Sequence, residues 1–242
     1  MKNFLLILVS VFSLYNYSYS QFVQERKIEA DEIVIENQKM EISVIDGVTE
    51  APMTADIIIR GLNPRKPVLL EAIKDTIVEI ENYRIYTVSC IKKGYMIYSE
   101  KFWPDEVQLH VQKVKLDPIE IGKTVNLLGI YFIGNKTQVN GKSKEAIDEL
   151  ITWLNLNKSV KIAVIGHVNG PNNNKSERFY QKASLERSRS VVTYLINNGI
   201  EEDRLVSKGK GNMDMLYPAA ETSWETEANR RIEIEIIGFN LD

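Results

Sequence analysis

The chain has few residues of the kinds that hold a fold together by covalent bonds or metal ions. Its 242 residues include one cysteine, Cys90, and two histidines, His110 and His167. One cysteine cannot form an internal disulfide, so the thiol is either buried and inert, as we expect, or free to pair between molecules. Zinc sites need closely spaced cysteine or histidine ligands, which this sequence does not have. We predict no metal site and no cofactor.

Signatures of catalysis and of nucleic-acid binding are also missing. Gly209-Lys210-Gly211 lacks the residues that complete a phosphate-binding loop, and no serine lies in a nucleophile motif. The formal net charge is −3, and no basic stripe carries interleaved aromatic residues. We predict that the protein is not an enzyme and that nucleic acid is not a partner.

Long apolar runs are absent as well. The run from Phe4 to Tyr15 has about a dozen residues, whereas a membrane-spanning helix needs about 20. Lys2 before it and Ser18-Tyr19-Ser20 after it are typical of an export signal, so we predict a signal peptide over residues 1–20. The mature chain is expected to have no transmembrane segment, and the lack of a cysteine at the cleavage site disfavours a lipid anchor.

The first domain predicted after the signal covers residues 21–117. Apolar residues recur there with period two, as in strands with one buried face. The clearest sets are Met40, Ile42 and Val44, and Val107, Leu109 and Val111. Turn signals lie at Asp46-Gly47, Asn63-Pro64, Lys93-Gly94 and Trp103-Pro104. We predict an all-β sandwich.

This predicted sandwich has a family likeness. The stretch from Val44 to Ala55, followed later by Gly94-Tyr95, resembles the carboxypeptidase-regulatory-like or transthyretin-like sandwiches of exported bacterial proteins. An unrelated immunoglobulin-like spacer is the alternative interpretation. In both cases the expected fold is Ig/transthyretin-like.

Residues 118–242 have a different pattern, which predicts a β-α-β-α-β domain with its helices packed on a mixed sheet. The apolar set Ile147, Leu150, Ile151 and Leu154 predicts a first helix, and a second is expected over Glu177 to Asn197, before Gly199. The predicted strands are Val125 to Phe132, Val160 to Ile165, Arg204 to Lys208 and Arg230 to Ile237. The whole chain is therefore predicted to be an α+β protein of two domains.

Short motifs in this second region, taken in order, carry a more specific likeness. They include Gly166-His167, Ser184 to Arg187, Gly199-Ile200, Gly209-Lys210-Gly211 and Asn229-Arg230-Arg231. From Ile119 to the end, the chain resembles the OmpA-like C-terminal domain that ties Gram-negative outer-membrane proteins to peptidoglycan. The resemblance implies an exported periplasmic protein associated with the outer membrane or the cell wall.

The same resemblance implies non-covalent binding of the diaminopimelate-type stem peptide of peptidoglycan. Arg187 matches the family arginine that pairs with a ligand carboxylate, and a planar guanidinium suits that role because it offers two parallel hydrogen bonds. A solvated helix arginine near Glu186 and Glu225 is the alternative. The predicted ligand-binding residues are His167, Asn169, Arg187, Asn229 and Arg231.

The sequence departs from the family at several of these positions. The family's Thr-Asp falls at Val168-Asn169, so a neutral amide replaces an acid. A charged hydrogen bond contributes about 1.5 to 3 kcal/mol and a neutral one about 0.5 to 1.5, so affinity is expected to fall by about tenfold. The family asparagine falls at Tyr180, its Gly-Arg falls at Glu225-Thr226, and the loop from Pro171 is longer.

Two functions fit these observations. In the first, the C-terminal domain binds peptidoglycan and the β-sandwich contacts an outer-membrane or periplasmic protein, so that the chain links the wall to that partner. In the second, the ligand pocket has degraded and the domain is a protein-interaction scaffold in an envelope complex. Arg187 and Asn229-Arg230-Arg231 favour the first, whereas Asn169, Tyr180 and Thr226 favour the second.

Overall fold

The computed structural model describes residues 37–61, 66–81, 85–102, 109–133, 136–170 and 175–240. The predicted signal over residues 1–20 lies outside these ranges, as do the predicted turns at Asn63-Pro64 and Trp103-Pro104 and most of the longer loop from Pro171. The protein is mixed α+β, as predicted. Gln38–Asp242 forms one compact unit. None of the described helices is long and apolar enough to cross a membrane.

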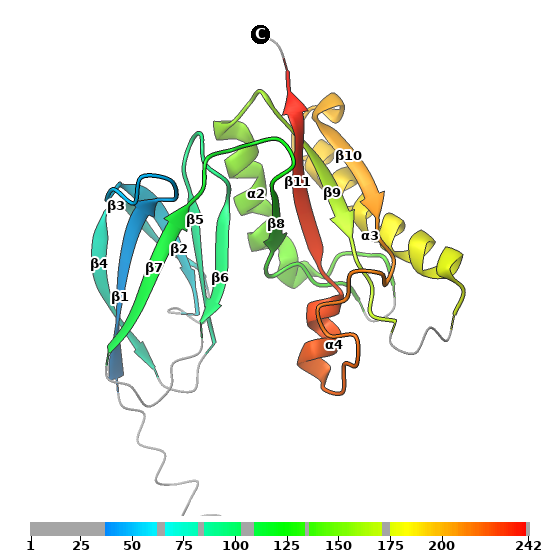
Figure 1. The fold of residues 1–242 in the computed structure, drawn as a ribbon, viewed down its shortest axis with the longest axis horizontal. Helices are drawn as coiled ribbons and strands as arrows, with labels where there is room; N and C mark the ends of the chain where they lie inside the picture. Colours follow the sequence, from blue (N-terminus) through cyan, green and yellow to red (C-terminus); the bar gives the residue numbers. More distant parts are fainter. Residues whose placement is uncertain are drawn as a thin grey trace, which may run out of the picture. The chain divides into compact units, whose positions relative to one another are not determined.

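The β-rich first region contains two sheets, with the strand orders β4-β1-β7 and β3-β2-β5-β6 (Figure 1). The first sheet consists of β1 (Asn37–Asp46), β4 (Asp75–Glu81) and β7 (Leu109–Leu116), and the second of β2 (Ala55–Arg60), β3 (Val68–Ile73), β5 (Tyr86–Ile91) and β6 (Tyr98–Phe102). Both sheets contribute side chains to one core, among them Met40, Ile42, Val44, Ile57, Val88 and Cys90. The Ig/transthyretin-like assignment stays a prediction.

The inward face of β7 differs from the predicted one. Val111 is 62% exposed, whereas Val114 and Leu116 are fully buried. Side chains alternate along a strand, so Val114 and Leu116 face the core and Val111 faces away from it. Val107 and the side chain of Leu109, the other members of the predicted set, lie outside the described residues. His110 belongs to the inward set, and its Nε2 lies 2.6 Å from Oε1 of Gln38. A buried polar pair thus occupies a position where the pattern predicts an outward side chain.

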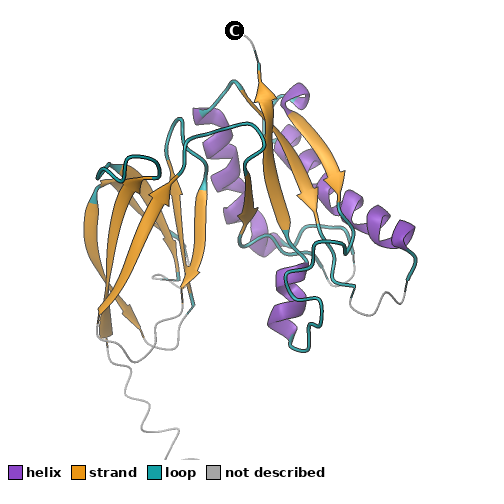
Figure 2. Cartoon of the chain, in the orientation of Figure 1, coloured by secondary structure: helices purple, strands orange, loops and turns teal. Residues whose placement is uncertain are grey.

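The second region is built on a four-stranded sheet in the order β10-β9-β11-β8. Its strands are β8 (Thr124–Leu127), β9 (Val160–Gly166), β10 (Leu205–Gly209) and β11 (Ile232–Phe239). β10 runs parallel to β9, and β11 runs antiparallel to β9 and β8, so the sheet is mixed, as predicted. Helices α2 (Lys144–Leu156) and α3 (Glu177–Asn197) cover one face of it (Figure 2).

The predicted element order of this region needs two corrections. The strand expected over Val125 to Phe132 ends at Leu127, because the chain turns at Gly129, which has a φ of +89°. The helix α4 (Ser223–Asn229) was not predicted. It begins with a capping box in which the side chains of Thr222 and Glu225 bond each other's backbone N–H groups. The Thr-x-x-Glu spacing was the signal that could have revealed it.

The core of the second region includes residues from the first. Ile91, Met96 and Ile97 belong to the same apolar cluster as Trp153 of α2. Trp153 Nε1 also donates to the Tyr95 carbonyl at 2.7 Å. The predicted domain boundary at Asp117-Pro118 stays a prediction, and the packing shows that α2 relies on both sides of it.

Candidate functional site

Helix α3 lies close to the carboxyl end of β9 because small residues face each other there. A Cβ added at Gly166 would lie 2.0 Å from the backbone oxygen of Ser184, and one at Gly209 would lie 2.5 Å from Ser184 Oγ. One turn further along, Ser188 Oγ donates to the Val164 carbonyl at 2.6 Å. These contacts fix the height and rotation of α3 on the sheet, and with them the position of Arg187.

Arg187 is a buried cation that forms no ion pair with any described carboxylate. Its side chain is 4% exposed, its Nη1 donates a long hydrogen bond of 3.5 Å to the His167 carbonyl, and its guanidinium lies 4.8 Å from the Phe132 ring centroid. In the described part of the chain, its Nε has no hydrogen-bond partner and no carboxylate forms an ion pair with it. Burial lowers the pKa of Arg187 to about 10, and the charge of Arg230 adds to this effect. The guanidinium is therefore still charged at neutral pH.

The alternative of a solvated helix arginine is wrong. Glu186 pairs with Arg189 at 2.8 Å, and Glu225 belongs to the α4 capping box, so neither acid accompanies Arg187. Buried charges are normally paired, because removal from water costs several kcal/mol for each ion.

A second buried arginine shows what a purely structural role requires in this fold. Arg204 is 2% exposed, and its guanidinium donates to three backbone carbonyls and one carboxylate. The acceptors, all at 2.9 to 3.0 Å, are Val160 O, Leu154 O, Asn157 O and Glu201 Oε2. Four of the five N–H donors of Arg204 are thus hydrogen-bonded, whereas Arg187 makes one long hydrogen bond within the described part of the chain.

The side chains of His167 and Arg231 meet at a different acid, Glu233. Nε2 of His167 lies 3.1 Å from one carboxylate oxygen, and Nε of Arg231 donates to the other at 2.8 Å. His167 is the main reason that the pKa of Glu233 falls to about 2, and Arg231 adds to the effect. Arg231 Nη2 also donates to the Asp214 carbonyl at 2.9 Å. That His167 and Arg231 contact a ligand stays a prediction. His167 contacts Arg187 through its backbone carbonyl and not through its side chain.

Asn169 and Asn229, which are 60 residues apart in the chain, form a direct pair. Nδ2 of Asn229 donates to Oδ1 of Asn169 at 2.8 Å and to the Tyr217 carbonyl at 2.8 Å. Oδ1 of Asn229 accepts from the Tyr217 backbone N–H at 2.9 Å. Asn229 is fully buried, whereas Asn169 is partly exposed. Asn229 therefore orients Asn169, and Asn169 is the member of the pair that solvent can reach.

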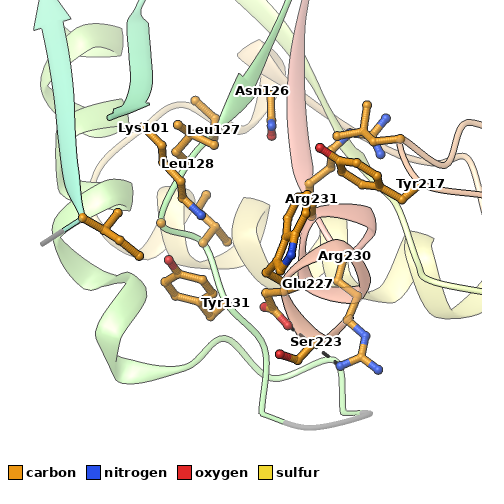
Figure 3. Close-up of a pocket in the computed structure, with 16 residues that line it drawn as sticks. Lys101, Asn126, Leu127, Leu128, Tyr131, Tyr217, Ser223, Glu227, Arg230 and Arg231 are labelled. Carbon is orange, nitrogen blue, oxygen red and sulfur yellow. Dashed lines mark ion pairs between the residues drawn. The ribbon is translucent and has the colours of Figure 1, made fainter. Parts of the chain in front are cut away.

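A cavity of about 620 Å³ lies beside α4 and is lined by Tyr131, Trp224, Glu227 and Arg230, among others (Figure 3). Figure 3 shows the ion pair between Arg230 and Glu227, whose closest atoms are 3.9 Å apart. The two residues change the pKa of Arg187 in opposite directions, because the positive charge of Arg230 lowers it and the negative charge of Glu227 raises it. The sequence leaves open whether Arg230 or Arg231 faces a ligand, because this depends on strand alternation, and both residues line this cavity.

The family departures at Tyr180 and Glu225 have structural explanations. Tyr180 is 4% exposed, and a Cβ at Gly170 would lie 2.6 Å from its ring, so the ring fills the space beneath this part of the loop. Glu225 caps α4.

The described residues contain no group of acids, histidines or cysteines that could hold a metal ion. Cys90 is buried, as expected, and burial raises its pKa to about 12.

Comparisons with known proteins agree with the resemblance seen in the sequence. Residues 131–231 match the model of the OmpA family. Outer membrane protein A of Serratia marcescens is 29% identical over 122 residues, covering 46% of this chain and 33% of that protein. The corresponding protein of Atlantibacter hermannii is 30% identical over 120 residues, covering 46% and 48%. The chain thus spans a third to a half of the length of these relatives.

The chain is also similar to a solved structure. The peptidoglycan-associated lipoprotein from Burkholderia pseudomallei is 12% identical, with a TM-score of 0.39, and the match covers 46% of this chain and 88% of that one.

Proposed function

We infer that this chain, which carries an OmpA-like C-terminal domain over residues 131–231, is a non-catalytic protein of the cell envelope that binds peptidoglycan. In this proposal the domain holds the stem peptide without covalent chemistry, and the guanidinium of Arg187 grips one of its carboxylates. The protein is exported and works in the periplasm, associated with the outer membrane or the wall. The two-sheet region contacts an outer-membrane or periplasmic protein, which makes the chain a linker.

The observation that carries this proposal is the incomplete coordination of Arg187. The guanidinium of Arg187 is 4% exposed, and its Nε has no hydrogen-bond partner among the described residues, so this group can still donate to an acceptor. A ligand carboxylate would supply both the missing hydrogen bonds and the missing negative charge. Arg204 shows that the same fold can satisfy a buried arginine internally where no ligand is needed.

The alternative, a scaffold with a degraded pocket, draws on the neutral side chain of Asn169 and on the ring of Tyr180. The buried Arg187 speaks against it, because the cost of removing this charge from water is offset only in part by one long hydrogen bond and the contact with the Phe132 ring.

Co-sedimentation with purified sacculi tests the proposal. The mature protein should pellet with the sacculi, and Arg187→Ala should lower the pelleted fraction strongly. Arg189→Ala is the matched control, because Arg189 lies on the same helix but is 58% exposed and paired with Glu186. Equal pelleting of all three proteins would remove Arg187 from its role. No pelleting of the wild-type protein would favour the scaffold.

A further inference from the structure

The cavity beside α4 is lined by residues other than those that the proposed function assigns to the stem peptide. Its lining includes the end of β8, the segment that follows it and much of α4. His167, Asn169 and Arg187 are not among the lining residues. The volume of about 620 Å³ lies within the range of about 300 to 1,000 Å³ that is typical of small-molecule pockets. The cavity is therefore large enough to hold a ligand group of its own.

Two buried polar atoms of residues that line this cavity have no hydrogen-bond partner among the described residues (Figure 3). One is an acceptor, Oδ1 of Asn126, and the other is a donor, Nη1 of Arg231. The side chain of Arg231 is 7% exposed, and its Nε and Nη2 are already bonded to Glu233 and to the Asp214 carbonyl. Buried polar groups are normally hydrogen-bonded. A ligand that completes this cavity offers both an acceptor and a donor.

Aromatic side chains give the same cavity an apolar face. Trp224 of α4 is 55% exposed, and the Tyr217 ring meets it edge to face, with the ring centroids 4.9 Å apart. Both rings are held in place, because α4 begins with its capping box and Asn229 at its end bonds the N–H and the carbonyl of Tyr217. A fixed and exposed indole presents a flat apolar surface to a ligand.

The two arginines of the lining are paired with acids of the protein. Arg230 lies 3.9 Å from Glu227, and Arg231 donates to Glu233 at 2.8 Å. Arg187, in contrast, forms no ion pair with any described carboxylate. Because its guanidinium charges are balanced, this cavity suits a neutral ligand, whereas Arg187 suits a carboxylate.

We propose that the cavity beside α4 binds an N-acetylated sugar, with the apolar face of the sugar ring on Trp224. An acetamido group offers a carbonyl acceptor and an N–H donor, the two kinds of group that Arg231 Nη1 and Asn126 Oδ1 lack. Resting on the proposed function, the sugar belongs to the glycan strand of peptidoglycan. Arg187 and this cavity then recognise different parts of one polymer, the stem and the strand.

Peptide-free oligosaccharides test this site apart from stem binding. The mature protein should bind an oligomer of N-acetylglucosamine in a titration followed by NMR. The cello-oligosaccharide of equal length, which has hydroxyls in place of the acetamido groups, should bind more weakly. Trp224→Ala should weaken binding of the N-acetylated oligomer by about tenfold, and Asn126→Leu, which removes the acceptor, should weaken it severalfold.

Phe179→Ala is the matched control for Trp224→Ala. Phe179 is 54% exposed, lies in the first turn of α3 and meets a tyrosine ring edge to face, but it does not line the cavity. This variant should bind the sugar as the wild-type protein does. Thermal unfolding of all variants separates a loss of binding from a loss of fold, and Trp224→Ala, which removes an exposed side chain, should stay folded.

The outcomes distinguish this proposal from the one on which it rests. No binding of the N-acetylated oligomer by the wild-type protein would overturn the sugar site, and pelleting with sacculi would still support stem binding. Wild-type affinity in both Trp224→Ala and Asn126→Leu would overturn the placement in this cavity. Equal affinity for the cello-oligosaccharide would overturn the role of the acetamido group. Sugar binding by a protein that does not pellet with sacculi would overturn the proposed function alone.

Discussion

At the scale of single residues, Arg187 and Arg204 are both buried but differ in how many of their N–H groups are hydrogen-bonded, and this difference should appear in their contributions to stability. Arg187→Met should leave the free energy of unfolding unchanged or raise it by up to about 2 kcal/mol, because an uncompensated buried charge is removed. Arg204→Met should lower it by about 3 to 5 kcal/mol, because three backbone carbonyls lose their donor. Urea unfolding of the two variants checks both values. A loss at Arg187 as large as that at Arg204 would mean that Arg187 is structural.

The same scale gives a pH dependence. The pKa of Glu233 is lowered from 4.5 to about 2 in the folded protein, so its ionised form stabilises the fold at pH values above about 4.5. This contribution is lost as the pH falls through about 2. The stability difference between the wild-type protein and Glu233→Gln should therefore shrink as the pH falls from 4.5 to 2. Urea midpoints measured across this range check it, and a difference that grows on acidification would contradict it.

At the scale of elements, a buried ion pair joins α2 to the first region, and its contribution to stability can be measured. Glu149 pairs with Arg60 at 2.6 Å, and both side chains are largely buried, at 9% and 16% exposure. Glu149→Ala leaves the buried Arg60 charge without its ion-pair partner, so it should lower the free energy of unfolding by about 3 kcal/mol. The double variant with Arg60→Met removes the unpaired charge as well and should recover part of this loss. The exposed pair of Lys144 and Asp148 is the control, since Asp148→Ala should change stability by under about 0.5 kcal/mol. Equal losses at both sites would contradict the buried joint.

The elements also show what a sequence can predict. The bounds of α3 could be predicted because Ser176 caps its start and Gly199, with a φ of +90°, closes its end. These signals are local. The face of β7 could not be predicted in the same way, because Val111 on one face and Val114 on the other are both apolar, and burial depends on which face meets the other sheet.

The candidate site follows the same division. Arg187 could be singled out by its place in a motif, but its burial depends on how closely Gly166 and Ser184 let α3 approach the sheet. The amide orientation of Asn169 depends on Asn229 and Tyr217, which lie far along the chain. Partners of this kind are set by the tertiary fold, and no local pattern contains them.

At the scale of the whole molecule, the two regions are expected to unfold together. Trp153 packs with Ile91, Met96 and Ile97 and donates to the Tyr95 carbonyl, so a fragment of residues 118–242 loses part of its own core. Calorimetry of the mature chain should give one transition, and the fragment should unfold at a lower temperature or fail to fold. Two transitions in the mature chain, one of them matching the isolated fragment, would contradict this coupling.

The most direct measurement of the central claim follows the Nε–H nitrogen resonance of Arg187 by NMR while a stem peptide is added. The resonance can be assigned by its loss in Arg187→Met. It should shift on binding, because Nε gains the acceptor that it lacks in the free protein, whereas the Nε–H of Arg204, already bonded to the Val160 carbonyl, should stay in place. Binding of the peptide with the Arg187 resonance unmoved would contradict the account.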